Sequence, residues 1–144
     1  MACGDAKCCL RTMIEKAPIS LLVTNVPNGA PAVRPMGTVL VDDDFVIWYA
    51  TGRSADKCRQ IEADSRVTVY WQAADPTGMW DYGHITGTAE LLDTPELRDR
   101  FWTDEWNRYF PGGKGDPELV LIKVTPQTGV CHHMPDWATH TTTF

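Results

Sequence analysis

The fold is decided by residues 19–41, which read ISLLVTNVPNGAPAVRPMGTVLV. Residues 19–24 are mostly β-branched or aliphatic, a composition typical of a strand. Asn28-Gly29 follows between two prolines, and this pair is the strongest short-range signal for a tight hairpin turn. We therefore predict that residues 19–24 pair antiparallel with the next strand, residues 32–41.

The pattern of short strands and turns continues beyond this hairpin. Further strands are predicted at residues 45–51, 66–72, 81–92 and 118–124, with a seventh candidate at residues 128–133. Helices are predicted at residues 5–17, 54–64 and 95–110, with Asp5, Ser54 and Thr94 as their N-caps. Six or seven short strands with hairpin turns favour an antiparallel barrel, because a doubly wound parallel sheet needs a helix after each strand. The predicted fold class is therefore mainly β with flanking helices.

The chain is predicted to form a single domain. It has 144 residues, about the length of one average domain, and no repeat or linker divides it. Residues 1–4 and residues 134–144 show no clear period and are predicted to be loose tails.

The charge and hydropathy of the chain argue against two classes of partner. The net charge is −6, from 13 Lys and Arg against 19 Asp and Glu, so we expect no nucleic-acid partner. The longest uninterrupted apolar run, residues 45–50, is far shorter than the ~18 residues of a membrane-spanning helix, so we expect no membrane partner. The first ten residues lack the basic start and apolar centre of a signal peptide, and a cytoplasmic protein is expected.

The chain has five irregularly spaced cysteines: Cys3, Cys8, Cys9, Cys58 and Cys131. Without a signal peptide, reduced thiols are expected. Cys131 is followed by His132 and His133, with His140 further on, which invites a metal-site interpretation. Successive side chains of a strand point to opposite faces, so only Cys131 and His133 would share one. Two ligands and a distant His make a poor tetrahedral site, and we predict no metal there unless an N-terminal cysteine reaches over.

Two neighbouring segments favour an anion. Arg34 precedes Pro35, which cannot donate a ladder hydrogen bond and marks an edge or a bulge where a side chain can turn toward a ligand. Within residues 51–57 a strand ends and a helix begins, and the first-turn N–H groups and the helix dipole attract anions. Lys57 in that first turn opposes the dipole unless an anion lies there. A solvated surface cation is the competing interpretation for each segment alone, but together they favour a phosphate site.

The order of these motifs resembles a known family. Arg34-Pro35-Met36 lies on a strand, the next strand ends in Tyr49-Ala50-Thr51, and Ser54 and Lys57 open a helix. From about residue 13 to about residue 126, the chain is similar to the FMN-binding split β-barrel proteins related to pyridoxamine 5'-phosphate oxidase. Within them it is closest to the short branch of general stress proteins of the 26 type. The resemblance implies a six-stranded antiparallel split β-barrel with flanking helices, and a homodimer with FMN at its interface.

The resemblance also implies which residues hold the phosphate. Arg34 would bind the FMN phosphate, and Lys57, helped by Ser54, would complete that site. Ala50 and Thr51 would lie beside the phosphate and the ribityl chain.

Contacts to the flavin ring follow from the same resemblance. The backbone of Pro35 and Met36 would run along the flavin, and Tyr82 stands where the oxidase branch has a Gln near the ring. The chain departs from the oxidase branch at Val39, where that branch has a cofactor-binding Lys, and at Asp56, which replaces a basic residue.

The C-terminal part departs further from the oxidase branch. That branch ends in a basic segment with an Arg-x-His motif that binds pyridoxal phosphate, whereas this chain has no Arg after Arg108. Losing two or three charge-assisted contacts of ~1.5–3 kcal/mol each would weaken substrate binding by several powers of ten. We therefore expect negligible oxidation of pyridoxine or pyridoxamine phosphate.

The sequence leaves three functions open. The first is a homodimeric FMN-dependent oxidoreductase acting on a small substrate stacked on the flavin, and Trp102, Trp106 and Tyr109 on one predicted helix suit a subunit interface. The second is a flavin-binding stress protein without turnover. The third is a relative that uses a deazaflavin or haem. No Ser-His-Asp or paired-carboxylate arrangement can be identified, which suits a cofactor that carries the chemistry.

Overall fold

The computed structural model describes residues 4–74, 77–134 and 136–144, and within them eight strands form one antiparallel sheet. The strands are β1 (Ile19–Thr24), β2 (Ala32–Gly37), β3 (Leu40–Val41), β4 (Ile47–Gly52), β5 (Arg66–Ala74), β6 (Trp80–Leu92), β7 (Leu119–His133) and β8 (Ala138–Thr143). The helices are α1 (Ala6–Lys16), α2 (Asp56–Ala63) and α3 (Pro95–Phe101), with short 3-10 turns at Asp104–Arg108 and Gly113–Gly115. The predicted class, mainly β with flanking helices, is confirmed. None of these helices is long and apolar enough to cross a membrane.

The predicted hairpin of residues 19–24 with the following strand is present. β1 pairs antiparallel with β2 from Ile19 opposite Gly37 to Thr24 opposite Ala32. Asn28 in its turn has a φ of 57°, the left-handed conformation that Asn tolerates better than most residues. β1 pairs on its other side with β5, so this hairpin forms one end of the strand order β2-β1-β5-β6-β7-β4-β3.

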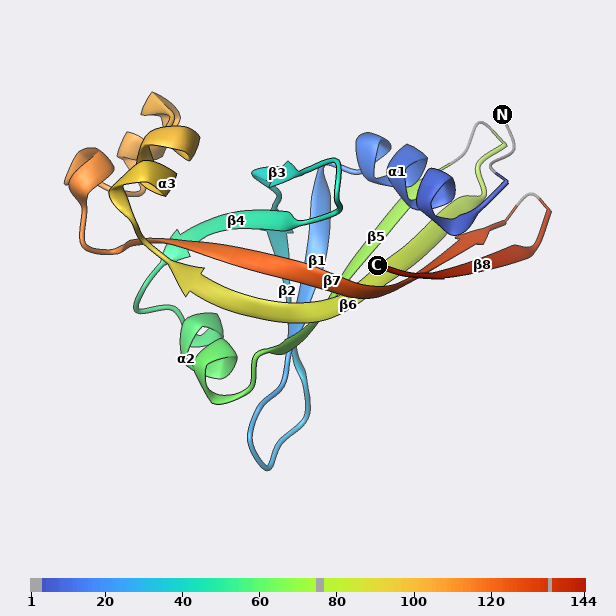
Figure 1. The fold of residues 1–144 in the computed structure, drawn as a ribbon, viewed down its shortest axis with the longest axis horizontal. Coiled ribbons are helices and arrows are strands. Elements are labelled where there is room, and N and C mark those ends of the chain that lie inside the picture. Colours follow the sequence, from blue (N-terminus) through green and yellow to red (C-terminus); the bar gives the residue numbers. More distant parts are fainter. Residues whose placement is uncertain (1–3, 75–76, 135) are drawn as a thin grey trace.

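The two longest strands curl the sheet into a half-barrel (Figure 1). The first half of β7 pairs with β4 and the second half with β8, while β6 runs beside both halves. The register between β6 and β7 shifts between Thr86 and Gly87. A Cβ at Gly87 would collide with the carbonyl oxygen of Thr125, so only glycine allows the two backbones to approach this closely.

The core lies on the concave side of the sheet, where α1 adds Leu10 and Met13 to it. Its fully buried strand residues include Leu22, Ile47, Tyr49, Val69, Trp71, Ile85, Ile122 and Val124. Tyr49 Oη lies 2.6 Å from Ser20 Oγ, which lies 3.2 Å from Thr38 Oγ1, so one hydrogen-bonded chain links β4 to β1 across the core.

Several predicted boundaries are wrong, each for a local reason. The strand predicted at residues 32–41 is interrupted after Gly37, which gives the separate two-residue strand β3. The two strands predicted on either side of Pro126 are one strand, because Pro126 lies opposite Gly87 at the register shift. The sheet consequently has eight strands rather than six, β3 and β8 being the additions.

The helix predicted at residues 95–110 ends at Phe101. Thr94 caps it as predicted, but Trp102 leaves the helical conformation and a 3-10 turn follows. The helical spacing of the aromatic residues reflects local packing, since the Trp102 and Trp106 rings meet edge-on at 5.9 Å.

The prediction of a loose C-terminal tail is wrong. β8 pairs with β7 from Thr128 opposite Thr143 to His133 opposite Ala138. The centroids of the Phe144 and Phe45 rings lie 5.1 Å apart, so Phe144 packs against the rest of the fold. Residues 1–3 and 135, which the same prediction covered, lie outside the described residues.

Candidate functional site

One corner of the half-barrel collects the cations that the sequence singled out. β2 contributes Arg34, β4 contributes Thr51 next to its last residue, and the first turn of α2 contributes Lys57. Thr24, the last residue of β1, and Gln60, one turn further along α2, complete the group. We call these five residues the α2 corner.

Arg34 is held in this corner by neutral oxygen atoms. Its Nη1 donates to Thr24 Oγ1 at 2.8 Å and to the Leu22 carbonyl at 3.3 Å, and its Nη2 donates to Gln60 Oε1 at 2.7 Å. Burial lowers the pKa of the Arg34 guanidinium, and the nearby Asp56 carboxylate partly opposes this effect. Arg34 is therefore a half-buried cation whose hydrogen-bond acceptors carry no charge.

Lys57 has a similar environment. Its Nζ donates to Thr51 Oγ1 at 3.0 Å, and its side chain is half-buried. Among the described residues neither Arg34 nor Lys57 forms an ion pair, because the carboxylate of Asp56 is paired with Arg59. Two cations without a carboxylate partner in one corner fit an anionic ligand better than a structural ion pair.

Ser54 does not cap α2 as predicted. Ala55 is the N-cap residue, and α2 has no side-chain cap. The hydroxyl of Ser54 donates instead to Glu118 Oε2 at 2.8 Å, and its backbone N–H points to the same oxygen at 3.3 Å. The Ala55 N–H donates to the Gly52 carbonyl, so two of the amides predicted to face an anion are already used.

The other residues implied on the neighbouring strands lie on different sides of the sheet. Met36 is buried and belongs to the core, as expected for a residue two positions from Arg34. Pro35 is exposed and opposes Leu21 on the convex face. Ala50 is half-buried in β4, next to Thr51, so it lies beside the α2 corner.

Tyr82 is not brought to the α2 corner of this chain. It pairs with Gln72 on β5, three positions from Val69, which lies level with Arg34 across β1. That offset is roughly 10 Å along the strands, and the strand spacings between β2 and β6 add roughly 14 Å across the sheet. Tyr82 instead stacks on the ring of His132, with 4.4 Å between the ring centroids.

The structure reveals a ring cluster on the convex face that the sequence reasoning missed. It consists of Tyr70, Tyr82, His84 and His132 on β5, β6 and β7. Burial first, and the neighbouring His132 second, lower the pKa of His84. A shallow depression beside it is lined by Leu21, Val23, Thr68, Tyr70 and His84. Strand alternation could have predicted this cluster, because its members occupy alternate positions of paired strands.

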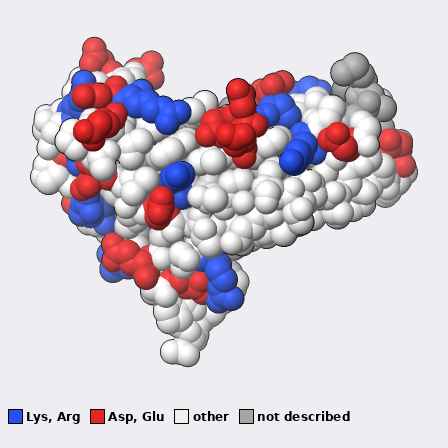
Figure 2. All heavy atoms as spheres, viewed as in Figure 1, with Lys and Arg blue, Asp and Glu red and all other residues white. Residues whose placement is uncertain are grey.

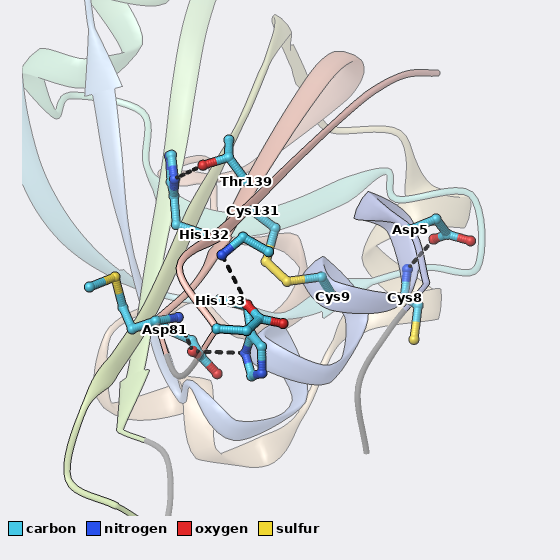
Figure 3. Close-up of a disulfide and its surroundings, with 11 residues drawn as sticks. Asp5, Cys8, Cys9, Asp81, Cys131, His132, His133 and Thr139 are labelled. Atoms are coloured by element: carbon cyan, nitrogen blue, oxygen red, sulfur yellow. Dashed lines mark hydrogen bonds and ion pairs between the residues drawn. A yellow bond between two sulfur atoms is a disulfide. The ribbon is translucent and has the colours of Figure 1, made fainter.

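The cysteine and histidine segment near the C-terminus is occupied by structural bonds (Figure 3). Cys131 forms a disulfide with Cys9, 122 residues away in the sequence, so the expectation of reduced thiols is wrong for this pair. His133 Nδ1 lies 3.1 Å from Asp81 Oδ1, and His132 Nδ1 lies 3.0 Å from Thr139 Oγ1. No group of three or more His, Cys, Asp or Glu side chains among the described residues is arranged to hold a metal.

Charged side chains are unevenly distributed on the surface. Figure 2 shows them over α2 and α3, along α1 and over the first half of β7, whereas the strip over the second half of β7 in this view carries none. The α2 corner therefore lies in the charged part of the molecule.

The sequence as a whole matches the family model described as pyridoxamine 5'-phosphate oxidase like, over residues 5–141. The chain belongs to this family. Among members of known sequence, this pyridoxamine 5'-phosphate oxidase-like protein is 28% identical over 124 residues to general stress protein 26 of Bacillus subtilis (strain 168), with 85% of each chain covered.

Solved structures agree with the fold of this pyridoxamine 5'-phosphate oxidase-like protein. A protein related to general stress protein 26 from Clostridium acetobutylicum superposes with a TM-score of 0.79 at 22% identity, covering 97% of this chain and 96% of the other. A heme binding protein from Mycobacterium smegmatis superposes with a TM-score of 0.78 at 15% identity, covering 99% of this chain and 60% of the other. These likenesses show the split-barrel fold.

Proposed function

We propose that this chain is a flavoprotein that binds FMN and transfers electrons or a hydride between the flavin and a small substrate stacked on it. The observation that carries the proposal is the α2 corner. Arg34 and Lys57 are half-buried there, and within the described part of the chain their hydrogen-bond acceptors are all neutral oxygens. A phosphate dianion would give both cations the charged partner that the described residues do not provide.

The residues of the corner suit the phosphate end of FMN. In this proposal Arg34 and Lys57 bind the phosphate oxygens, while the Thr51 hydroxyl keeps Lys57 in place. Ala50 and Ser54 flank the ribityl chain and the phosphate. The flavin ring supplies the redox chemistry when bound, and the protein supplies binding, orientation and a dry pocket.

The proposal includes a homodimer with FMN at its interface. Side chains on the convex face of β1 and β2 remain accessible, with Val33 58% exposed, which leaves apolar surface for a second copy. Pro35 and Met36 of one chain would lie along the flavin. Because Tyr82 lies on β6, with β1 and β5 between it and Arg34 on β2, it would reach the flavin from the second copy.

Haem is a second candidate ligand. The structural relative from Mycobacterium smegmatis is named for haem binding. The lowered pKa of His84 keeps its imidazole neutral at pH 7, and a neutral imidazole beside an apolar depression is a suitable iron ligand.

The absorption spectrum of the purified protein, with the mass of any ligand released by heat, tests both candidates. FMN gives a flavin spectrum and releases the mass of FMN, whereas haem gives a Soret band. Steady-state turnover with reduced nicotinamide and a quinone acceptor then separates an oxidoreductase from a flavin-binding stress protein without turnover. A haem spectrum without flavin would overturn the FMN proposal.

A further inference from the structure

The disulfide between Cys9 and Cys131 joins the first half of α1 to β7. Cys9 lies in the first half of α1, and Cys131 lies in the second half of β7, beyond the part that pairs with β4. Figure 3 shows the bond running from the helix to the strand that carries His132 and His133. It is a covalent link between the two ends of the chain.

Non-covalent contacts also hold α1 on the sheet. Its large buried side chains other than Cys9 are Leu10 and Met13. Both pack against glycines of the sheet: a Cβ at Gly129 would lie 2.8 Å from Leu10 Cδ1, and one at Gly83 would lie 3.0 Å from Met13 Cε.

Arg11 also donates to the carbonyl oxygens of Val41 and Asp42 and lies over the Phe45 ring. The second half of α1 keeps these contacts without the disulfide, whereas the first turns depend more on Cys9.

Both sulfur-bearing residues are inaccessible while α1 is docked. Cys131 is 0% exposed and Cys9 is 7% exposed. A reductant can therefore reach the bond only when the helix lifts, and once the bond is cut the helix loses its covalent anchor. Breakage of the disulfide and release of the helix favour each other.

We infer that the Cys9–Cys131 disulfide is a redox latch that keeps the first half of α1 on the concave face of the sheet when oxidised and releases that half when reduced. Reduction transfers two electrons and two protons from a dithiol, which becomes a cyclic disulfide, and leaves thiols at Cys9 and Cys131. The inference does not depend on the proposed flavin, because the disulfide and the glycines against α1 lie in α1, the first half of β6 and the second half of β7, outside the α2 corner.

Hydrogen exchange of the α1 amides, followed by mass spectrometry on the full chain with and without dithiothreitol, tests this inference. We expect reduction to raise exchange in the first half of α1, residues 6–10, roughly tenfold or more, while exchange in β1 and β4 stays unchanged. Cys9→Ser should show the fast exchange without reductant and no further response to it.

Cys8 is also disulfide-bonded, so dithiothreitol reduces that bond as well. The Cys8→Ser variant separates the two effects, because it retains the latch and should respond to reductant like the wild type. Cys58→Ser, a substitution of the buried free thiol, serves as the matched control for loss of a buried cysteine.

Two results would overturn the inference. One is unchanged exchange in α1 after complete reduction of the wild-type protein, a comparison that does not depend on any variant folding. The other is alkylation of both Cys9 and Cys131 in unfolded protein that has never met a reductant, because this would mean that the bond is absent.

Discussion

At the scale of single residues, Arg34 illustrates how a fold can prepare a cation for a ligand. Burial of a guanidinium without a carboxylate partner costs free energy, and its lowered pKa reflects that cost. The amide of Gln60 and the hydroxyl of Thr24 satisfy some of its N–H groups without neutralising it. A phosphate would complete this arrangement, which is why we assign the corner to a ligand rather than to stability.

Substituting either cation should weaken FMN binding selectively. Each of Arg34→Ala and Lys57→Ala removes a charge-assisted contact of ~1.5–3 kcal/mol, so we expect roughly 10- to 150-fold weaker FMN binding. Riboflavin lacks the phosphate and should bind each variant as it binds the wild type. Arg108→Ala, which removes an exposed cation outside the corner, is the matched control. Equal losses for FMN and riboflavin, measured by fluorescence titration, would show that these residues do not contact the phosphate.

Tyr49 predicts how stability depends on alkaline pH. Burial, opposed by hydrogen bonds to Ser20 and Thr38, raises the pKa of Tyr49 to about 12, whereas an unfolded tyrosine titrates near 10. Between these pH values the folded protein keeps a proton that the unfolded chain has lost, so the free energy of unfolding falls as the pH rises. Measured by urea denaturation, the free energy of unfolding of the wild type should fall by about 2 kcal/mol more across this window than that of Tyr49→Phe. An equal pH dependence in both proteins would contradict this, and Tyr109→Phe, at an exposed tyrosine, should behave like the wild type.

The sequence predicted which residue types form the α2 corner but not their partners. Arg34, Thr51 and Lys57 stood out because a proline and a strand-to-helix junction lie beside them. Gln60 and Thr24 did not, since their role depends on α2 packing across the end of β1. The Cys9–Cys131 disulfide was missed for the same reason, because a separation of 122 residues leaves no local pattern.

At the scale of elements, Arg98 fastens α3 to the sheet. Its guanidinium donates to the carbonyl oxygens of Asp93, Lys114, Asp116 and Leu119, at distances from 2.8 to 3.1 Å. Asp93 lies just before α3. Lys114 and Asp116 lie in and just after the 3-10 turn at Gly113–Gly115, and Leu119 is the first residue of β7. The guanidinium of Arg98 thereby links, by hydrogen bonds, the two ends of the segment that connects β6 to β7.

Arg98→Lys should therefore destabilise the protein more than the same change at Arg100. A lysine keeps the charge but cannot reach four carbonyl oxygens with a planar fork, so we expect a loss of about 1.5–3 kcal/mol in the free energy of unfolding. Arg100, which lies on the same helix as Arg98, sits over the rings of Trp48 and Phe101. A lysine at position 100 keeps the positive charge there. Urea denaturation of both variants measures the difference, and equal stability would show that the fork is dispensable.

Elements with a local signal were predicted well, and those that depend on distant partners were not. Asp5 caps α1 as expected, and β1 has the predicted bounds. β8 consists mostly of threonines, so its sequence shows little alternation of apolar and polar residues. The strand forms because β7 offers a free edge beyond the part that pairs with β4. The continuity of β7 across Pro126 likewise depends on the glycine opposite it in β6.

At the scale of the whole molecule, the two faces of the half-barrel sheet differ in how far their side chains are buried. α1 and the core fill the concave side, whereas the convex face of β1 and β5 keeps half-exposed apolar and aromatic side chains. Such a face is a suitable surface for a second copy of the chain.

We predict a homodimer at micromolar concentration, with a mass of twice the 16.1 kDa of the chain. FMN should shift the equilibrium further toward the dimer, because a ligand bound between two subunits stabilises their association. Val33→Asp, which places a charge on the convex face, should weaken the dimer without unfolding the chain. Sedimentation velocity measures all three, and a monomer that carries bound FMN would contradict the shared-site arrangement.

The binding of FMN and riboflavin to the ligand-free wild-type protein, measured side by side by calorimetry with haemin as a third ligand, tests the central claim most directly. The phosphate is the part of FMN for which the α2 corner offers two cations, so FMN should bind at least roughly tenfold more tightly than riboflavin. Haemin should bind more weakly than FMN. Riboflavin binding as tight as that of FMN, or tight binding of haemin alone, would contradict the account.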